Sequence, residues 1–332
     1  MAQNRNGNQK PPSGRAGTLS CQLYLHIGYP KTGTTFLQQA LFPHAQGMNF
    51  IRNSVAEELD MIAHQDHLNF NPDAVKTSLE KHFRSGKNLI SNESLLGNFY
   101  VFKSINNTMI ADRLKLLFPN AKIIITIRNQ YDLIESLYKQ YLHRGGVKKF
   151  RDFANFKNGG FNAAYNGWSF SVHITLFDYL KLVQYYENLF GKENTFLIPY
   201  ELLRKDPQLF AQKLFSWMEV GEIPNFKSEF YNQGYGAAQV RIARFFNRFL
   251  KSKFNEEPII PDVCLPITGK IDVGKLRRVL QSPLSRKLLG AKPITDFEMK
   301  GQVQKFFEKS NRQMNERYSL LLDQICPGEY FE

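Results

Sequence analysis

A glycine-punctuated turn near the start of the chain carries a lysine and three threonines between an apolar run and a helical pattern. The turn is Gly28–Thr35, with the sequence GYPKTGTT. Its glycines let the backbone bend tightly and direct successive N–H groups at an anion, and the N-terminus of the following helix adds a positive dipole end. The stretch therefore predicts a strand, a phosphate-binding loop and a helix, with Lys31 inside the loop.

The loop departs from the nucleotide-hydrolysing pattern G-x-x-x-x-G-K-[ST] at one informative position. Gly28, Gly33 and Thr35 match this pattern, but Thr34 stands where it has a lysine, and Lys31 lies earlier in the loop. That class of enzyme needs its lysine after the second glycine to reach the terminal phosphates, so the loop disfavours ATPase or kinase chemistry. A P-loop kinase, which would bind ATP and depend on Mg²⁺, stays open as an alternative.

Two charged side chains end predicted strands further along the chain. The short strand predicted at 89–93 ends in the carboxylate of Glu93, and Arg128 ends the β-branched run 121–127. Such a run is typical of a central parallel strand that is buried on both faces. Because ligands collect at the carboxyl ends of strands in open α/β sheets, we expect Glu93 where a catalytic group would lie.

Strand and helix patterns alternate along the chain. Leu23, Leu25 and Ile27 alternate with Tyr24 and His26, which predicts a half-buried first strand. Further strands are predicted at 48–51, 89–93, 121–127 and 195–198, and helices at 36–41, 54–83, 108–118, 129–142, 172–190, 207–217 and 297–322. The alternation predicts an α/β fold with a central parallel sheet flanked by helices on both faces.

Composition is that of a soluble globular protein, and 332 residues can bury a sizeable core. Residues 1–20 are polar without an apolar centre, so we expect a disordered leader there and one domain at 21–332. No run approaches the roughly 20 apolar residues that cross a bilayer. Three widely spaced cysteines, Cys21, Cys264 and Cys326, favour a reducing compartment and hence the cytoplasm. They have no metal-site spacing.

The net charge of +13 indicates anionic partners of some kind. Basic residues concentrate after position 237, where Arg241, Arg244, Arg248 and Lys251 share one face of a predicted helix. A nucleic-acid-binding module built on that helix is an alternative reading, which predicts tight and salt-sensitive binding. The Asn-, Gly- and aromatic-rich stretch 150–171 shows little periodicity and predicts a loop or lid on the acceptor side.

Three segments together resemble the sulfotransferases that use 3′-phosphoadenosine 5′-phosphosulfate (PAPS). The loop wording P-K-T-G-T-T-x-L resembles their 5′-phosphosulfate loop, and IRNQYDLIESLY resembles the segment in which an arginine and a serine eight residues later hold the 3′-phosphate. The resemblance assigns that pair to Arg128 and Ser136. A forked guanidinium and a helix hydroxyl suit a phosphate. Gln130 departs from the family, which often has proline there.

The third segment, FGKENTFLIPYELLRKDP, resembles the family's strand followed by Tyr-Glu and Asp-Pro. In relatives the tyrosine lies near the adenine, which makes Tyr200 a candidate donor contact. The Arg-Lys-Gly loop that completes the 3′-phosphate site in cytosolic relatives is not visible in this sequence. Lys227, Asn232–Gly234 and Arg241 are possible substitutes.

The resemblance implies sulfuryl transfer from PAPS to an acceptor hydroxyl, with 3′-phosphoadenosine 5′-phosphate (PAP) as product. Lys31 would contact the leaving 5′-phosphate while Thr32, Gly33, Thr34 and Thr35 cradle it. The sulfuryl group carries a single negative charge, so we expect no metal requirement.

Glu93 is the candidate base, because carbohydrate-modifying members often use glutamate where cytosolic relatives have histidine. His44 is a rival base, whereas His26 lies within a strand pattern and is expected to be structural. The expected acceptor is a hydroxyl of a sugar or glycan. Because the protein is positively charged, that glycan could be anionic. A small-molecule or lipid hydroxyl is the alternative.

Overall fold

The fold is described here from a computed structural model, which covers most of the chain after residue 20. The described residues are 21–52, 54–97, 106–162, 171–221, 223, 226, 235–250, 252, 264–265, 269–270, 280, 282–290 and 292–331. The expected leader at 1–20 lies outside them, as do Lys227, Asn232–Gly234 and Lys251.

Strands and helices alternate through the first two thirds of the chain, and helices predominate after them. In chain order the elements are β1 Cys21–His26, α1 Thr34–Phe36, η1 Leu37–Leu41, η2 Phe42–His44, β2 Met48–Ile51, α2 Ala56–His64, α3 Pro72–Glu80, β3 Gly86–Ser91, η3 Glu93–Leu96, α4 Asn107–Leu117, β4 Lys122–Ile127, α5 Gln130–His143, α6 Phe150–Phe153, β5 Phe156–Lys157, β6 Gly160–Phe161, η4 Ile174–Phe177, α7 Tyr179–Phe190, β7 Thr195–Pro199, α8 Tyr200–Lys205, α9 Pro207–Met218, α10 Ala237–Asn247, β8 Cys264–Leu265, β9 Gly269–Lys270, α12 Pro283–Leu289, α13 Phe297–Tyr318 and α14 Leu322–Ile325.

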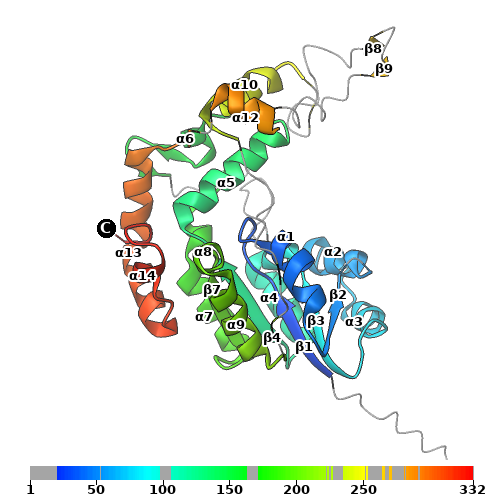
Figure 1. Ribbon diagram of the computed structural model, residues 1–332. Helices are drawn as coiled ribbons and strands as arrows, with labels where there is room; N and C mark the ends of the chain where they lie inside the picture. The colour runs from blue at the N-terminus through cyan, green and yellow to red at the C-terminus, as the bar shows by residue number, and fades with distance from the viewer. Residues whose placement is uncertain are drawn as a thin grey trace, which may run out of the picture.

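Five parallel strands form the central sheet in the order β2-β3-β1-β4-β7 (Figure 1). Strand β1 pairs with β3 on one side and with β4 on the other. The chain leaves β1 toward β2 and β3 and later crosses to β4 and β7, so its winding reverses between β1 and β4. Ligands of open α/β sheets bind at such a switch point, beyond the carboxyl ends of the strands.

Apolar side chains from both faces of the sheet enter separate cores. Leu25 and Ile125 pack into one core with helices α2, α4, α5 and α7, whereas Tyr24 and Ile124 pack into the other with α8, α9 and the helical stretch after the loop. This confirms the predicted parallel sheet with helices on both faces. The expectation of a half-buried first strand was wrong, because Tyr24 and His26 are also buried, with their polar atoms hydrogen bonded inside the protein.

Several predicted segments differ in detail. The helix expected over 54–83 is divided into α2 and α3. The strand expected to end at Glu93 ends at Ser91, and Glu93 begins the short turn η3. The helix expected over 172–190 is divided at Asp178 into the short turn η4 and the helix α7. The stretch expected to be an aperiodic loop contains helix α6 and the antiparallel pair β5 and β6, while residues 163–170 lie outside the description. At the C-terminal end, the 22-residue helix α13 packs along α5 and α7 (Figure 1).

Candidate active site

The loop after β1 is a tight turn that depends on its glycines. A Cβ at Gly28 would lie 1.8 Å from Thr126 Oγ1, so no larger residue fits there without movement. Gly33 has a φ of 85°, and a Cβ on it would lie 2.8 Å from Leu203 Cδ2. Lys31 has a φ of 66°, which is uncommon for a residue with a side chain. The loop then enters helix α1 at Thr34, as the sequence predicts.

A chain of buried side-chain hydrogen bonds runs beneath the loop. Thr32 Oγ1 lies 2.7 Å from Thr126 Oγ1, which lies 3.2 Å from Nε2 of His26. On the other side of the ring, His26 Nδ1 lies 2.7 Å from Ser91 Oγ, to which Gln38 Nε2 donates at 3.1 Å. Burial lowers the pKa of His26 to about 3, so the imidazole is neutral near pH 7. His26 thus connects the loop to the end of β3.

Glu93 and Lys31 influence each other's charge across the end of the sheet. Burial raises the pKa of Glu93, and the Thr34 hydroxyl, Lys31 and Arg144 oppose that rise. Burial lowers the pKa of Lys31, Glu93 opposes this change, and Arg144 and Arg128 add to it. A partly desolvated carboxylate beside a lysine is the kind of pair that general acid–base chemistry uses.

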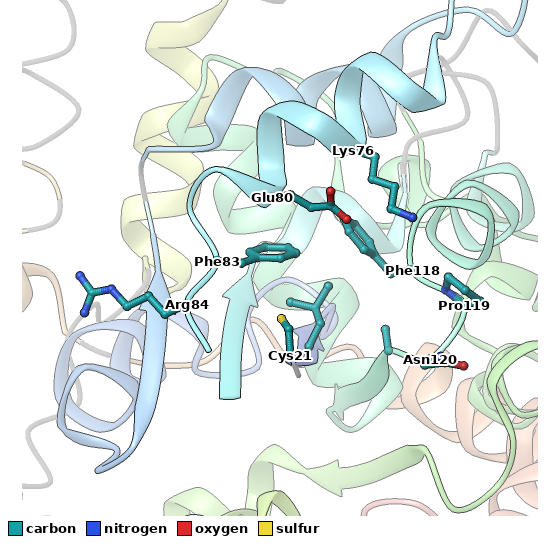
Figure 2. Close-up of a pocket in the computed structure, with 10 residues that line it drawn as sticks. Cys21, Lys76, Glu80, Phe83, Arg84, Phe118, Pro119 and Asn120 are labelled. Atoms are coloured by element: carbon teal, nitrogen blue, oxygen red, sulfur yellow. The ribbon is translucent and has the colours of Figure 1, made fainter. Parts of the chain in front are cut away.

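A cavity of about 320 Å³ opens beside Glu93, and its volume is sufficient for a small ligand. The lining residues of the cavity beside Glu93 are Thr34, Thr35, Gln38, Arg52, Ser91, Asn92 and Glu93. All of these side chains are polar. A cavity of about 460 Å³ lies around Cys21 and Phe118, at the opposite, amino-terminal end of the strands (Figure 2). Another of about 460 Å³ lies among β7, α9 and residues 318–320.

The sequence prediction missed Arg52 and Gln38 as members of this site. Arg52 directly follows Ile51, the last residue of strand β2. The rule that placed Glu93 at the carboxyl edge of the sheet therefore also applied to Arg52. Gln38 carried no comparable signal, because it lies within the helical pattern that follows the loop.

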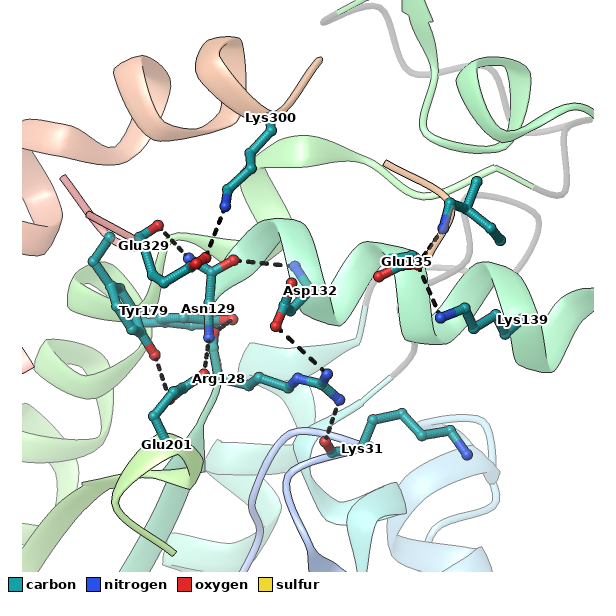
Figure 3. Close-up of polar contacts among 12 residues, drawn as sticks. Lys31, Arg128, Asn129, Asp132, Glu135, Lys139, Tyr179, Glu201, Lys300 and Glu329 are labelled. Atoms are coloured by element: carbon teal, nitrogen blue, oxygen red, sulfur yellow. Dashed lines mark hydrogen bonds and ion pairs between the residues drawn. The ribbon is translucent and has the colours of Figure 1, made fainter. Parts of the chain in front are cut away.

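Arg128, directly after β4, is tied to the loop (Figure 3). Its Nη1 donates to the carbonyl oxygen of Lys31 at 3.2 Å, and its Nη2 lies 3.7 Å from Oδ2 of Asp132. The Lys31 side chain extends away from the guanidinium in the same view. The structure thus brings the loop and Arg128 to one edge of the sheet.

Tyr200 lies close to the same guanidinium, and Ser136 lies on the helix that follows Arg128. The Arg128 guanidinium lies 5.2 Å from the centroid of the Tyr200 ring. A Cβ on Gly33 would lie 3.2 Å from that ring, so Tyr200 borders both the loop and Arg128. Ser136 follows Asp132 by four residues on α5 and therefore lies on the same helix face, one turn further on.

A family model described as "Sulfotransferase family" matches residues 25–222 of the chain. The protein belongs to the sulfotransferase family. The match contains the loop, Glu93, Arg128 and Tyr200, and it ends before α10. Among curated proteins, none matches this sulfotransferase significantly.

Solved sulfotransferase structures resemble the fold at low sequence identity. A sulfotransferase from Alicyclobacillus acidocaldarius is 17% identical over 63% of this chain and 85% of its own, with a TM-score of 0.44. A mouse sulfotransferase complexed with PAP is 15% identical over 61% of each chain, with a TM-score of 0.36. The sulfotransferase domain of the curacin biosynthetic pathway is 14% identical over 88% of this chain and 98% of its own, with a TM-score of 0.38.

Two other candidate residues, the rival base His44 and the possible 3′-phosphate contact Arg241, do not line the cavity beside Glu93. His44 is exposed at the end of η2 and does not line the cavity beside Glu93. Arg241 is exposed on α10.

The described residues include no group of three His, Cys, Asp or Glu side chains that could hold a metal ion. Within the same residues, no helix has the length and apolar character needed to span a membrane.

Proposed function

We propose that this sulfotransferase transfers the sulfuryl group of PAPS to a hydroxyl of a sugar or glycan. The observation that carries the proposal is the hydrogen bond from Arg128 to the backbone of Lys31, which joins two anion-binding features at the switch point of the sheet. PAPS has a phosphate at each end of its ribose unit. A phosphate-binding loop and an arginine at one edge of the sheet supply one positive group for each of these two phosphates.

The donor is proposed to lie with its 5′-phosphosulfate on Lys31 and the loop residues Thr32, Gly33, Thr34 and Thr35. Its 3′-phosphate would contact Arg128 and Ser136, and its adenine would lie near Tyr200. One buried atom supports this fit, since Arg128 Nε has no hydrogen-bond partner within the described part of the chain. Buried polar atoms without partners are unfavourable, and donor oxygens would satisfy them.

In the proposed reaction, the acceptor oxygen attacks the sulfur while its proton passes to the Glu93 carboxylate. The bond between sulfur and the bridging oxygen of the 5′-phosphate breaks, and its electron pair stays on the leaving PAP. Lys31 stabilises the charge that develops on that oxygen. Burial raises the pKa of Glu93, which suits a base that must accept a proton near neutral pH.

The cavity beside Glu93 favours a sugar over a phenol or lipid acceptor. Its lining is polar, and amide groups such as those of Gln38 and Asn92 can hydrogen bond to sugar hydroxyls. Arg52 in the lining and Arg144 nearby add positive charge, which would suit an anionic glycan. A phenol or lipid hydroxyl, the alternative acceptor, would be expected to need apolar side chains here.

We further propose that residues 21–332 form one domain and that the enzyme acts in the cytoplasm. The exposed Cys21 and the partly buried Cys326 are both free, which agrees with a reducing compartment.

Transfer of labelled sulfate tests the proposal directly. Purified protein is incubated in EDTA with sulfur-labelled PAPS and a panel of neutral glycans, acidic glycans, phenols and sterols. We expect label on glycans and little on phenols or sterols. Label on phenols or sterols alone would favour the alternative acceptor class, and PAP formation with no labelled acceptor would leave hydrolysis as the activity.

A further inference from the structure

The turn that carries Arg128 is bonded to the C-terminal end of the chain, far outside the region that the family model matches. Asn129 Nδ2 donates to the carbonyl oxygen of Glu329 (Figure 3). The backbone N–H of Asn129 donates to Oε1 of Glu201 at 2.8 Å, and the Tyr330 hydroxyl donates to Oε2 of the same carboxylate at 2.9 Å. The Glu201 carboxylate therefore bonds to both the turn and the C-terminal segment.

A second connection passes through Gln130, the first residue of α5. Gln130 Nε2 donates to Asn311 Oδ1 at 2.7 Å, and Asn311 Nδ2 donates back to Gln130 Oε1 at 3.2 Å. Asn311 Nδ2 also donates to the Tyr330 carbonyl oxygen at 3.1 Å. Both amides are almost completely buried, so the pair fixes helix α13 and residue 330 against the turn. A proline at position 130 could make neither bond.

The backbone on both sides of the Arg128 side chain is held by these contacts. The Arg128 carbonyl oxygen accepts a hydrogen bond from the Tyr179 hydroxyl at 2.5 Å, and the next peptide N–H is the one bonded to Glu201. An ion pair of 3.0 Å between Lys300 and Glu329 adds a link from α13 to the same end. Fixed backbone on both sides limits the positions that the guanidinium can reach.

We propose that the C-terminal segment Glu329–Phe331 and Asn311 are a positioning element for Arg128, which they hold in place for the 3′-phosphate of the donor. The element touches the turn and not the donor, so Tyr330 and Asn311 are positioning residues. The assignment of Arg128 to the 3′-phosphate rests on the proposed function, whereas the ordering of the turn does not. Loss of the element is expected to weaken donor binding without removing a donor contact.

Tyr330→Phe tests the proposal with Tyr24→Phe as its matched control. Both tyrosines are buried, and each variant removes one hydroxyl that donates a hydrogen bond, at 2.9 Å to Glu201 and at 2.8 Å to the Met218 carbonyl oxygen. Met218 ends α9, and its carbonyl oxygen also accepts a hydrogen bond from Lys87 near the start of β3, so this contact lies at the amino-terminal end of the strands. Tyr330→Phe should lose somewhat more thermal stability, because its bond goes to a carboxylate and that of Tyr24 goes to a neutral carbonyl oxygen. Position in the fold is therefore reported by where exchange becomes faster, and not by the loss of stability itself.

Two readouts follow for each variant. Hydrogen–deuterium exchange of the peptide containing residues 127–133 should become about tenfold faster in Tyr330→Phe and stay unchanged in Tyr24→Phe. The Kd for PAP, measured by calorimetry in EDTA, should rise about tenfold in Tyr330→Phe alone, which corresponds to about 1.4 kcal/mol.

Unchanged exchange in Tyr330→Phe would overturn the proposed positioning element. Faster exchange with an unchanged Kd would overturn its role toward the donor. If the unaltered protein binds no PAP, the proposed function fails, and the exchange result still decides whether the C-terminal segment orders the turn.

Discussion

Glu93 and Lys31 are close enough for each to oppose the change that burial makes in the pKa of the other. A lysine assigned to the leaving group and a carboxylate assigned to the acceptor proton must occupy one small region for transfer to occur in line. Their proposed roles differ, because Lys31 would stay charged while Glu93 would gain a proton. Substitutions at the two positions should therefore have separable effects.

We expect Glu93→Gln to keep donor affinity and lose turnover. The amide keeps the shape of the side chain but cannot accept the hydroxyl proton, and loss of a general base typically lowers rates about 10²–10⁴-fold. Single-turnover transfer of label and PAP calorimetry on the same preparation check this. Turnover close to that of the unaltered enzyme would assign the base to another residue.

The buried imidazole of His26 should make the free energy of unfolding depend on pH. Its pKa is about 3 in the folded protein against an ordinary value of 6.5, so between these pH values the unfolded chain binds more protons. The free energy of unfolding therefore falls as pH falls through this window, by up to about 1.4 kcal/mol per pH unit.

Urea unfolding of the unaltered protein and of His26→Gln between pH 7 and pH 4 measures this effect. The variant is expected to be less stable at pH 7, because it loses hydrogen bonds to Ser91 and Thr126, but to lose less stability on acidification. Parallel curves for the two proteins would contradict a neutral, buried imidazole.

At the scale of elements, the loop between β1 and α1 packs closely against strand β4. Gly28 lies against Thr126 of β4, and the hydroxyl of Thr126 also holds Thr32. A change at the first residue of the loop is therefore transmitted to the threonine next to Gly33. The loop and the adjacent strand act as one unit.

We expect Gly28→Ala to destabilise the protein by about 1–3 kcal/mol, the usual effect of overpacking, and to weaken PAP binding. Gly301→Ala in α13 is the matched control, because a Cβ there meets nothing within 4 Å. That variant should gain about 0.5–1 kcal/mol from helix propensity. Chemical denaturation and calorimetry measure both quantities. A Gly28→Ala protein as stable as the control would show that the loop has more room than the structure indicates.

The sequence was sufficient to predict the five strands of the central sheet and the loop, because their signals are local. The β-branched run ending at Arg128 and the glycine spacing of the loop required no knowledge of the fold. The burial of Tyr24 and His26 was missed, since polar residues in a strand suggest solvent until their hydrogen-bond partners are known. The Gln130–Asn311 pair was also beyond prediction, because nothing local relates residues 181 positions apart.

Across the whole molecule, the matched region 25–222 contains the proposed donor contacts, and the last helices support them from outside. Helix α13 packs on α5 and α7, and the segment after α14 reaches the turn that carries Arg128. The proposed donor site would thus depend on residues from both ends of the described chain. We propose that these parts form a clamp for a nucleotide with phosphates at its 5′ and 3′ positions.

Calorimetric titration of the protein with PAP and with ATP tests this claim most directly. In EDTA we expect PAP to bind at least about tenfold more tightly than ATP, because only PAP offers a 3′-phosphate for a charge-assisted bond to Arg128. Arg128→Gln should remove most of that preference while leaving the affinity for ATP nearly unchanged. No binding of PAP, or tighter binding of ATP once Mg²⁺ is added, would contradict the account and favour a kinase.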